Sequence, residues 1–212
     1  MFGKVLHAVE RESVGQTAAV IDMITGTTSV PRVPAICWGI EHEKKAIETY
    51  CRLVNKIVKE TGLWVFPNGF LAASPDGIVF DPKVSTEQPE GIIEVKCPYY
   101  AREHTFSELE QMDKWPKYLL ENGSLKPGTD YYHQVQGELY ATGATLCDFV
   151  VWTPRDIHIT RVYPSEVWIK NDFSKLVDFY LENLLTRNLD LLTLEGILFF
   201  SYFLLSFHFR LQ

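Results

Sequence analysis

Residues 74–98 read SPDGIVFDPKVSTEQPEGIIEVKCP, and they contain a turn and two apolar runs that predict a pair of neighbouring strands. A Pro-Asp-Gly turn places Asp76 at the start of a short apolar strand. After a polar excursion the chain returns as a second apolar strand at 92–97, on which Glu94 and Lys96 share one face because side chains alternate along a strand. If the two strands pair, the Asp76 and Glu94 carboxylates converge on one point, with the Lys96 ammonium beside them.

This convergence predicts a metal-dependent hydrolase. Two carboxylates a few ångströms apart repel each other unless they are protonated or bridged by a cation, and oxygen ligands without His or Cys favour Mg²⁺ or Mn²⁺. Such a cation polarises a phosphodiester, while Lys96 could position or deprotonate the attacking water and oppose charge on phosphorus. Either fragment alone is also common on solvated hairpins, so the prediction depends on their combination and order.

The surrounding chain predicts a mixed α/β domain, in which a central sheet lies between helices. Apolar residues at three-to-four spacing indicate an amphipathic helix over 43–60, with Glu43 on the inward stripe. Further helices are expected at 102–120, 130–142 and 167–185. Short apolar runs bounded by Gly, Pro, Asp or Asn predict strands at 63–66, 70–73, 78–80, 92–97, 147–152 and 157–163.

Composition limits the function and the compartment. The formal charge of −7 and the pI near 5.4 argue against a protein that binds nucleic acid through a broad basic surface. Four cysteines without a CxxC pair favour a reducing intracellular compartment, nucleus or cytoplasm. The amino terminus shows no signal peptide.

Three segments are expected along the chain. Residues 1–33 form a divergent amino-terminal segment, residues 34–189 the catalytic domain, and residues 190–212 a hydrophobic tail. The tail approaches the length of a membrane span. A membrane anchor, a buried terminal helix and a non-native end all remain open for it.

Four separated motifs carry a resemblance to a known family. They are CWGIEHEKKAIE (37–48), AASPDGIVF (72–80), IEVKCPY (93–99) and YYHQVQGELYATG (131–143), and the likeness continues through CDFVVWTPRDIHITRVY (147–163). In this order they resemble the lambda-exonuclease-like YqaJ viral recombinase family of the PD-(D/E)XK nuclease superfamily. The resemblance implies a restriction-endonuclease-like core.

The resemblance also implies roles for individual residues. Asp76, Glu94, the Val95 carbonyl and Glu43 would be metal ligands. Lys96 would be the catalytic lysine, and Gln134 would orient the lysine and the water.

Candidates for contact with DNA are Gln136, His133, Tyr99 and Tyr140. A histidine near a helix start, such as His133, is more commonly a solvated cap residue, and strand-end aromatics such as Tyr99 are more commonly core residues.

The implied function is a Mg²⁺-dependent DNA exonuclease that acts 5′ to 3′ on linear duplex ends, in recombination, repair, or viral or mobile-element processing. A homotrimer and a single-strand annealing partner are implied as well. The family's amino-terminal helices are matched only in GQTAAVIDMI, so a remnant that binds DNA or protein without cutting is the alternative. An endonuclease or junction resolvase on the same fold is a third hypothesis.

Overall fold

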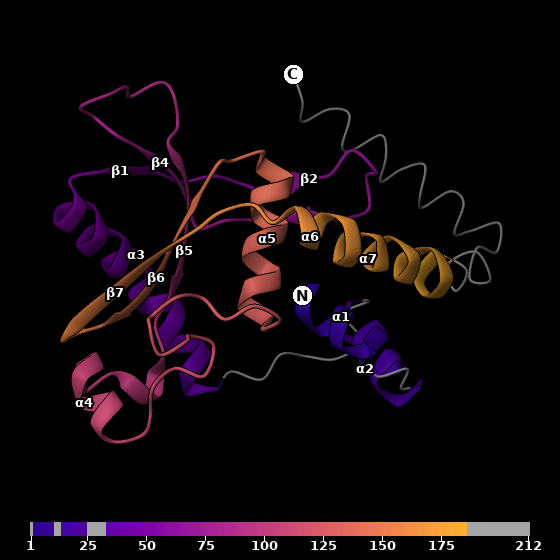
Figure 1. Ribbon diagram of the computed structural model, residues 1–212, viewed down its shortest axis with the longest axis horizontal. Coiled ribbons are helices and arrows are strands. Elements are labelled where there is room, and N and C mark those ends of the chain that lie inside the picture. The colour runs from indigo at the N-terminus through magenta and orange to yellow at the C-terminus, as the bar shows by residue number, and fades with distance from the viewer. Residues whose placement is uncertain (1, 11–13, 25–32, 186–212) are drawn as a thin grey trace.

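A five-stranded mixed sheet forms the centre of the protein, as the computed structural model shows for residues 2–10, 14–24 and 33–185 (Figure 1). Its strand order is β1-β4-β5-β6-β7. Strands β5 and β6 are parallel, and the other neighbouring pairs are antiparallel. The predicted fold class, a mixed sheet between helices, is confirmed. The strand bounds are β1 (Ile57–Lys59), β4 (Gly77–Phe80), β5 (Gly91–Lys96), β6 (Cys147–Thr153) and β7 (Asp156–Val162).

Strands β4 and β5 pair as the sequence predicts. Gly77 lies opposite Ile93, so the residue before β4, Asp76, lies next to Glu94. The ladder extends through this residue, because the Asp76 N–H donates to the Ile93 carbonyl at 3.1 Å. The turn therefore delivers its carboxylate to the end of β5.

Helix α3 (Pro34–Val54) covers one face of the sheet, where Ala46 and Tyr50 pack against Ile93 and Val95 of β5. The predicted helix at 43–60 was wrong at both ends. Pro34 lies at the first turn of the real helix, where its missing N–H costs nothing. The helix ends at Asn55, whose left-handed conformation (φ 55°) caps it, and the residues after it form edge strand β1.

Helix α5 (Asp130–Thr142) covers the opposite face, where Val135 and Leu139 pack against Ile92 and Phe149. Its predicted bounds are confirmed. The Thr129 side chain caps the first turn, and a glycine in the left-handed region ends the helix.

The single helix predicted at 102–120 was wrong. The structure has a short 3₁₀ turn, η1 (Tyr99–Ala101), and one short helix, α4 (Phe106–Gln111). Asp113 has a positive φ of 55°, which interrupts the helical backbone, and Pro116 lacks a donor for helical bonding.

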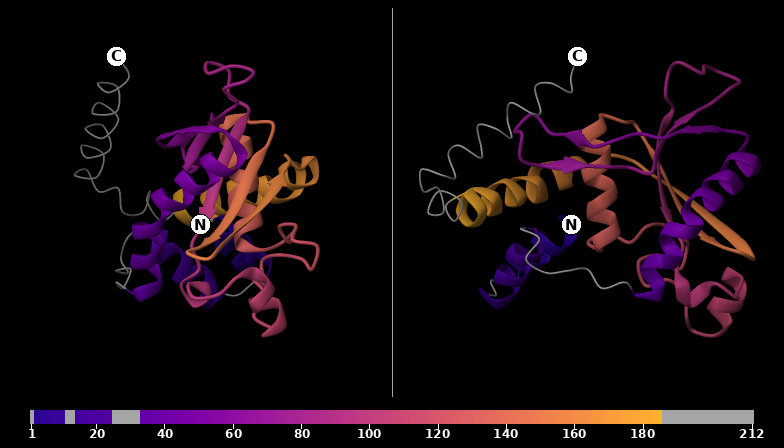
Figure 2. Two further views of the ribbon diagram at one scale, coloured as in Figure 1. Left: turned by 90° about the vertical axis from the view of Figure 1, so that its left-hand side faces the viewer. Right: turned by 180° about the vertical axis from the view of Figure 1, so that it is seen from behind.

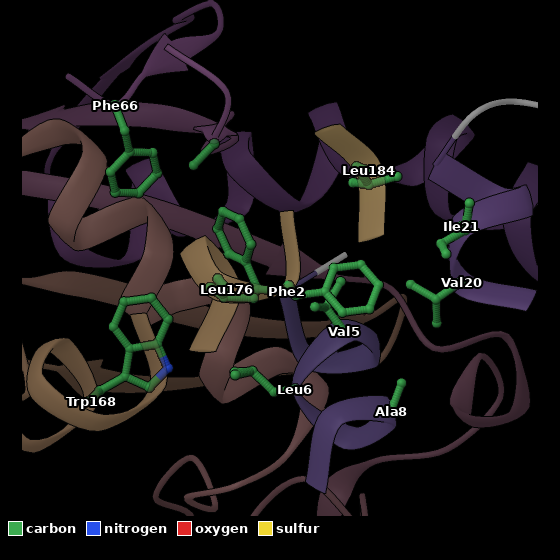
Figure 3. Close-up of a cluster of buried hydrophobic side chains, with 12 residues drawn as sticks. Phe2, Val5, Leu6, Ala8, Val20, Ile21, Phe66, Trp168, Leu176 and Leu184 are labelled. Carbon is green, nitrogen blue, oxygen red and sulfur yellow. The ribbon is translucent and has the colours of Figure 1, made fainter. Parts of the chain in front are cut away.

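A third hydrophobic cluster joins the two ends of the described chain (Figure 3). Phe2, Leu6 and Trp168 are among its buried members. The cluster gathers α1 (Phe2–Glu10), α2 (Val14–Ile24), the hairpin of β2 (Trp64–Val65) and β3 (Ala72–Ala73), and the helical run α6 (Glu166–Trp168), η2 (Ile169–Phe173), α7 (Ser174–Phe179) and η3 (Tyr180–Leu185). Figure 2 shows α1 between α5 and this run, with α2 next to α1.

The predicted helix at 167–185 thus corresponds to consecutive helical segments with two π-helical stretches. None of the helices in the described ranges is long and apolar enough to cross a bilayer. The hydrophobic tail at 190–212 lies outside the described residues.

Candidate active site

Asp76 is fixed by the backbone of β5. Its Oδ2 accepts the Val95 N–H at 2.7 Å, in addition to the ladder bond made by its own N–H. Burial is the main cause that raises the pKa of Asp76, and the bond from Val95 and the charge of Lys96 oppose it. The carboxyl group is therefore held in one place at the mouth of the strand.

Glu94 is the buried centre of the site, with 1% of its surface exposed. Its Oε1 accepts hydrogen bonds from the Lys96 ammonium and, at 2.7 Å, from the Gln134 amide. Its Oε2 receives no hydrogen bond from the N–H or hydroxyl groups of the described residues, but the carboxyl group lies within hydrogen-bonding reach of the Asp76 and Glu138 carboxyl groups. Burial, with a contribution from Asp76, raises the pKa of Glu94 to about 7.

Lys96 is held between a carboxylate and an aromatic ring. Its ammonium pairs with Glu94 and lies 4.8 Å from the centre of the Tyr131 ring. Burial lowers the pKa of this ammonium, but the attraction of Glu94 outweighs it and the net pKa is raised. Lys96 is thus a positioned cation.

Gln134 connects α5 to the strand pair. Its Nε2 donates to Glu94 Oε1 and also, at 2.9 Å, to Glu138 Oε1. The structure therefore joins Asp76, Glu94, Lys96 and Gln134 through contacts centred on the last residues of β5.

Glu43 lies at the rim of this cluster, on the side of α3 that faces Asp76 and Lys96, and its side chain is exposed. It lines two hollows. The first, of about 740 Å³, also contains Asp76, and the second, of about 530 Å³, also contains Lys96 and Tyr99. Burial and the nearby charge of Asp76 raise the pKa of Glu43.

A third hollow of about 620 Å³ lies on the far side of two tyrosines, Tyr118 and Tyr131, which also line the second hollow. Gln134 lines it together with the cationic Lys4 and Lys117. The cluster of Asp76, Glu94, Lys96 and Gln134 thus borders a succession of three hollows, of which the third contains two lysines.

The donor set suits a hard divalent cation. Within the described ranges, no group of three or more acidic, His or Cys side chains is arranged to enclose a metal. Mg²⁺ does not require such a cage, because it is commonly bound by one or two carboxylates, waters and substrate phosphate. The unpartnered Oε2 of Glu94 beside Asp76 supplies this kind of site.

The remaining candidates for DNA contact lie elsewhere in the structure. The Gln136 amide donates to the Tyr163 carbonyl and accepts the Ser165 N–H. Buried His133 accepts a hydrogen bond from the Trp168 indole at 2.9 Å.

The two tyrosine candidates also pack within the fold. Tyr140 stacks obliquely on Phe66 and edge-on against Phe173. Tyr99 lies at the rim of the second hollow with the Arg102 guanidinium 4.1 Å from its ring. A role in DNA contact stays a prediction for all four candidates.

Two residues at the site were missed by the sequence analysis, Tyr131 and Glu138. Glu138 follows Gln134 by four residues and so occupies the same side of the helix, which was a readable signal. A Cβ at Gly137 would meet the Phe2 ring at 2.1 Å, so this position makes room for α1.

Comparison with known proteins identifies the family. The model of the YqaJ-like viral recombinase domain matches residues 6–145. The chain belongs to this family. The YqaJ-like match begins within α1 and therefore includes part of the segment set apart as 1–33.

Solved exonuclease structures share this YqaJ-like fold. The alkaline exonuclease LHK-Exo from Laribacter hongkongensis is 26% identical, with a TM-score of 0.62 over 90% of this chain and 93% of that one. LHK-Exo in complex with dAMP gives the same values. A phage related exonuclease from Haemophilus somnus is 15% identical, with a TM-score of 0.54 over 79% and 82% of the two chains. No curated protein sequence matches the chain. Family and structural neighbours together support a nuclease function.

Proposed function

We propose that this chain is a metal-dependent DNA exonuclease that hydrolyses phosphodiester bonds at linear duplex ends in the 5′ to 3′ direction. The observation that carries the proposal is the arrangement around Glu94. This carboxylate is buried, is bonded to Lys96 and Gln134, and lies beside Asp76. The polarity and the role in recombination rest on the family resemblance.

A divalent cation, Mg²⁺ or Mn²⁺, would be held by Asp76 and Glu94, with the Val95 carbonyl and Glu43 as further ligands. When bound, it supplies a Lewis acid that polarises the phosphodiester and lowers the pKa of a bound water. The free Oε2 of Glu94 is the oxygen best placed for this role.

Lys96 would supply a fixed positive charge to the phosphate. Glu94 and the Tyr131 ring orient its ammonium, and the raised pKa keeps it protonated. Donors that are already oriented stabilise developing negative charge without reorganisation. A role as hydrogen-bond donor therefore fits the geometry better than a role as base.

The DNA would follow the hollows on either side of the cluster. In the third hollow, Lys4 and Lys117 outnumber the acidic Asp130, so this hollow offers cations although the net charge is −7. In the first hollow, Lys44 and Arg52 stand among four acidic side chains, Glu43, Glu48, Glu60 and Asp76. LHK-Exo has been solved with dAMP, a mononucleotide of the kind that an exonuclease releases. By analogy we expect this chain to release mononucleotides.

The test measures acid-soluble nucleotides released from linear duplex DNA by the full chain, with Mg²⁺ and with EDTA. Asp76→Ala and Lys96→Ala should each lower the rate by at least about 100-fold, because transition-state charge stabilisation is lost. The exposed Glu87 and Lys83 of the β4–β5 loop give matched controls, and their alanine variants should cut normally. Unchanged release by Lys96→Ala would refute the assignment.

Substrates with different ends separate the rival hypotheses. Cutting of closed circular DNA would indicate an endonuclease or resolvase, and earlier loss of a 5′ label than of a 3′ label would support the proposed polarity. A remnant would show DNA binding without release. In that case, Mg²⁺ should still raise the unfolding temperature of the wild type more than that of Asp76→Ala if the metal site is intact.

The homotrimer, the annealing partner and the intracellular location stay predictions. Light scattering of the full chain tests the first. Co-purification from the native host tests the second, and fractionation of its cells tests the third.

A further inference from the structure

Glu138 is a buried acidic residue beside the site that the proposed chemistry does not use. Only 2% of its surface is exposed. Its Oε1 accepts a hydrogen bond from the Gln134 amide at 2.9 Å. Its Oε2 receives no hydrogen bond from the N–H or hydroxyl groups of the described residues, although the Glu94 carboxyl group lies within hydrogen-bonding reach. Burial of an unpaired carboxyl oxygen is unfavourable and is uncommon outside functional sites.

The hydrogen bonds of Gln134 determine which way its side-chain amide is turned. A primary amide has two N–H groups, and Gln134 places one on Glu94 Oε1 and the other on Glu138 Oε1. Rotating the amide by a half turn would present its carbonyl oxygen to both carboxyl groups. Glu138 therefore disfavours the reversed amide as long as Oε1 is an acceptor, which places any proton of the carboxyl group on Oε2.

The amide orientation matters because Glu94 Oε1 is shared. The same oxygen accepts from Lys96, so Gln134 and Lys96 converge on it from α5 and from β5. A reversed amide would repel this oxygen and displace the carboxylate on which the lysine depends.

We propose that Glu138 is a positioning residue, which holds the Gln134 amide with its N–H groups toward Glu94 and thereby fixes Glu94 and Lys96 for catalysis. This inference rests on the proposed nuclease function. It needs an acceptor at position 138, and it does not need a negative charge there.

Two substitutions separate these properties. Glu138→Met keeps the side-chain length but removes the acceptor, and it should lower kcat by about tenfold, the upper end of the effect expected for loss of one uncharged hydrogen bond. Removal of the unpaired Oε2 favours folding and loss of the acceptor for the Gln134 N–H opposes it, so kcat and not the unfolding temperature tests the role. Glu138→Gln retains a carbonyl oxygen and should keep kcat within about threefold of the wild type.

A double-mutant cycle tests whether Glu138 acts through Gln134. In a Gln134→Ala background, Glu138→Met should cause no further loss of kcat, because the amide that it positions is absent. Thr142→Ala is the matched control, since it removes a hydrogen bond to the Glu138 main-chain carbonyl on the same helix without touching the Gln134 amide. That variant should cut normally.

The outcomes distinguish this inference from the proposed function. Normal cutting by Glu138→Met overturns the positioning role, as does additive loss in the double mutant. A Glu138→Gln variant as impaired as Glu138→Met overturns it in favour of a role for charge. If the wild type itself releases no nucleotides, the proposed function fails. The orientation of the Gln134 amide is then tested by NMR spectroscopy of its side-chain N–H resonances. Glu138→Met should shift these resonances and Thr142→Ala should not, and unchanged resonances in Glu138→Met would overturn the inference.

Discussion

Helix α1 should contribute several kcal/mol to the unfolding free energy of the core. The change in this free energy caused by Leu6→Ala tests the contribution. Leu6 is completely buried in the cluster that joins α1 to the carboxyl-terminal helical run. The substitution removes three buried carbon atoms at about 0.8 kcal/mol each, or about 2.4 kcal/mol of transfer free energy. The cavity left behind raises the expected loss in unfolding free energy to about 3–4 kcal/mol.

The assay is equilibrium unfolding in urea. With a denaturant slope of about 2 kcal/mol per molar urea, the midpoint should fall by about 1.5–2 M while the slope stays constant. Lys4→Ala, an exposed position on the same helix, should change the unfolding free energy by less than about 0.5 kcal/mol. A similarly small change for Leu6→Ala would refute the reasoning, because residues 1–33 would then be a detachable segment outside the core.

Three further predictions follow from buried contacts. Gly137→Ala should destabilise the fold by about 1–3 kcal/mol in the same urea assay, because the new methyl group meets the Phe2 ring at 2.1 Å. Tyr50→Phe should cost about 1–3 kcal/mol, since the buried Asp148 carboxylate loses the hydroxyl donor at 2.5 Å; an unchanged midpoint would contradict this. In EDTA, stability should fall as pH rises from about 4.5 to 7, because burial raises the folded-state pKa of Glu94 to about 7 and its ionisation above the unfolded-state pKa opposes folding. Glu94→Gln should flatten this pH profile, and an equally steep profile in the variant would argue against Glu94 as its source.

The parts of the structure that depend on local sequence were predictable. The Pro-Asp-Gly turn and the alternation of Glu94 and Lys96 describe the β4–β5 pair, whose pairing the structure confirms. Helix α5 was also predictable, because the Thr129 cap and the glycine after the helix mark both ends.

Errors arose where one residue overrides a pattern. The apolar spacing of α3 continues past Asn55, yet the left-handed backbone there stops the helix, and the β-branched residues beyond it pair with β4. Between α4 and α5, the positive φ of Asp113 had the same effect. The spacing of apolar residues does not indicate where a residue with a positive φ ends a helix.

Contacts between distant segments were not predictable from the sequence. The closeness of Phe2 to Gly137 and of Trp168 to His133 depends on how α1 and α6 fold back onto α5. The polar partners of His133 and Gln136 likewise come from residues about thirty positions away.

Helix α5 has almost no surface free to change over evolutionary time. Val135 and Leu139 meet the sheet, Gly137 admits α1, and Gln134 and Glu138 serve the site. A substitution at one of these positions would commonly require a compensating change in another element, such as a smaller residue in place of Phe2. Sequence variation in α5 should therefore be epistatic, and among related chains its residues should change together with those of α1 and β5.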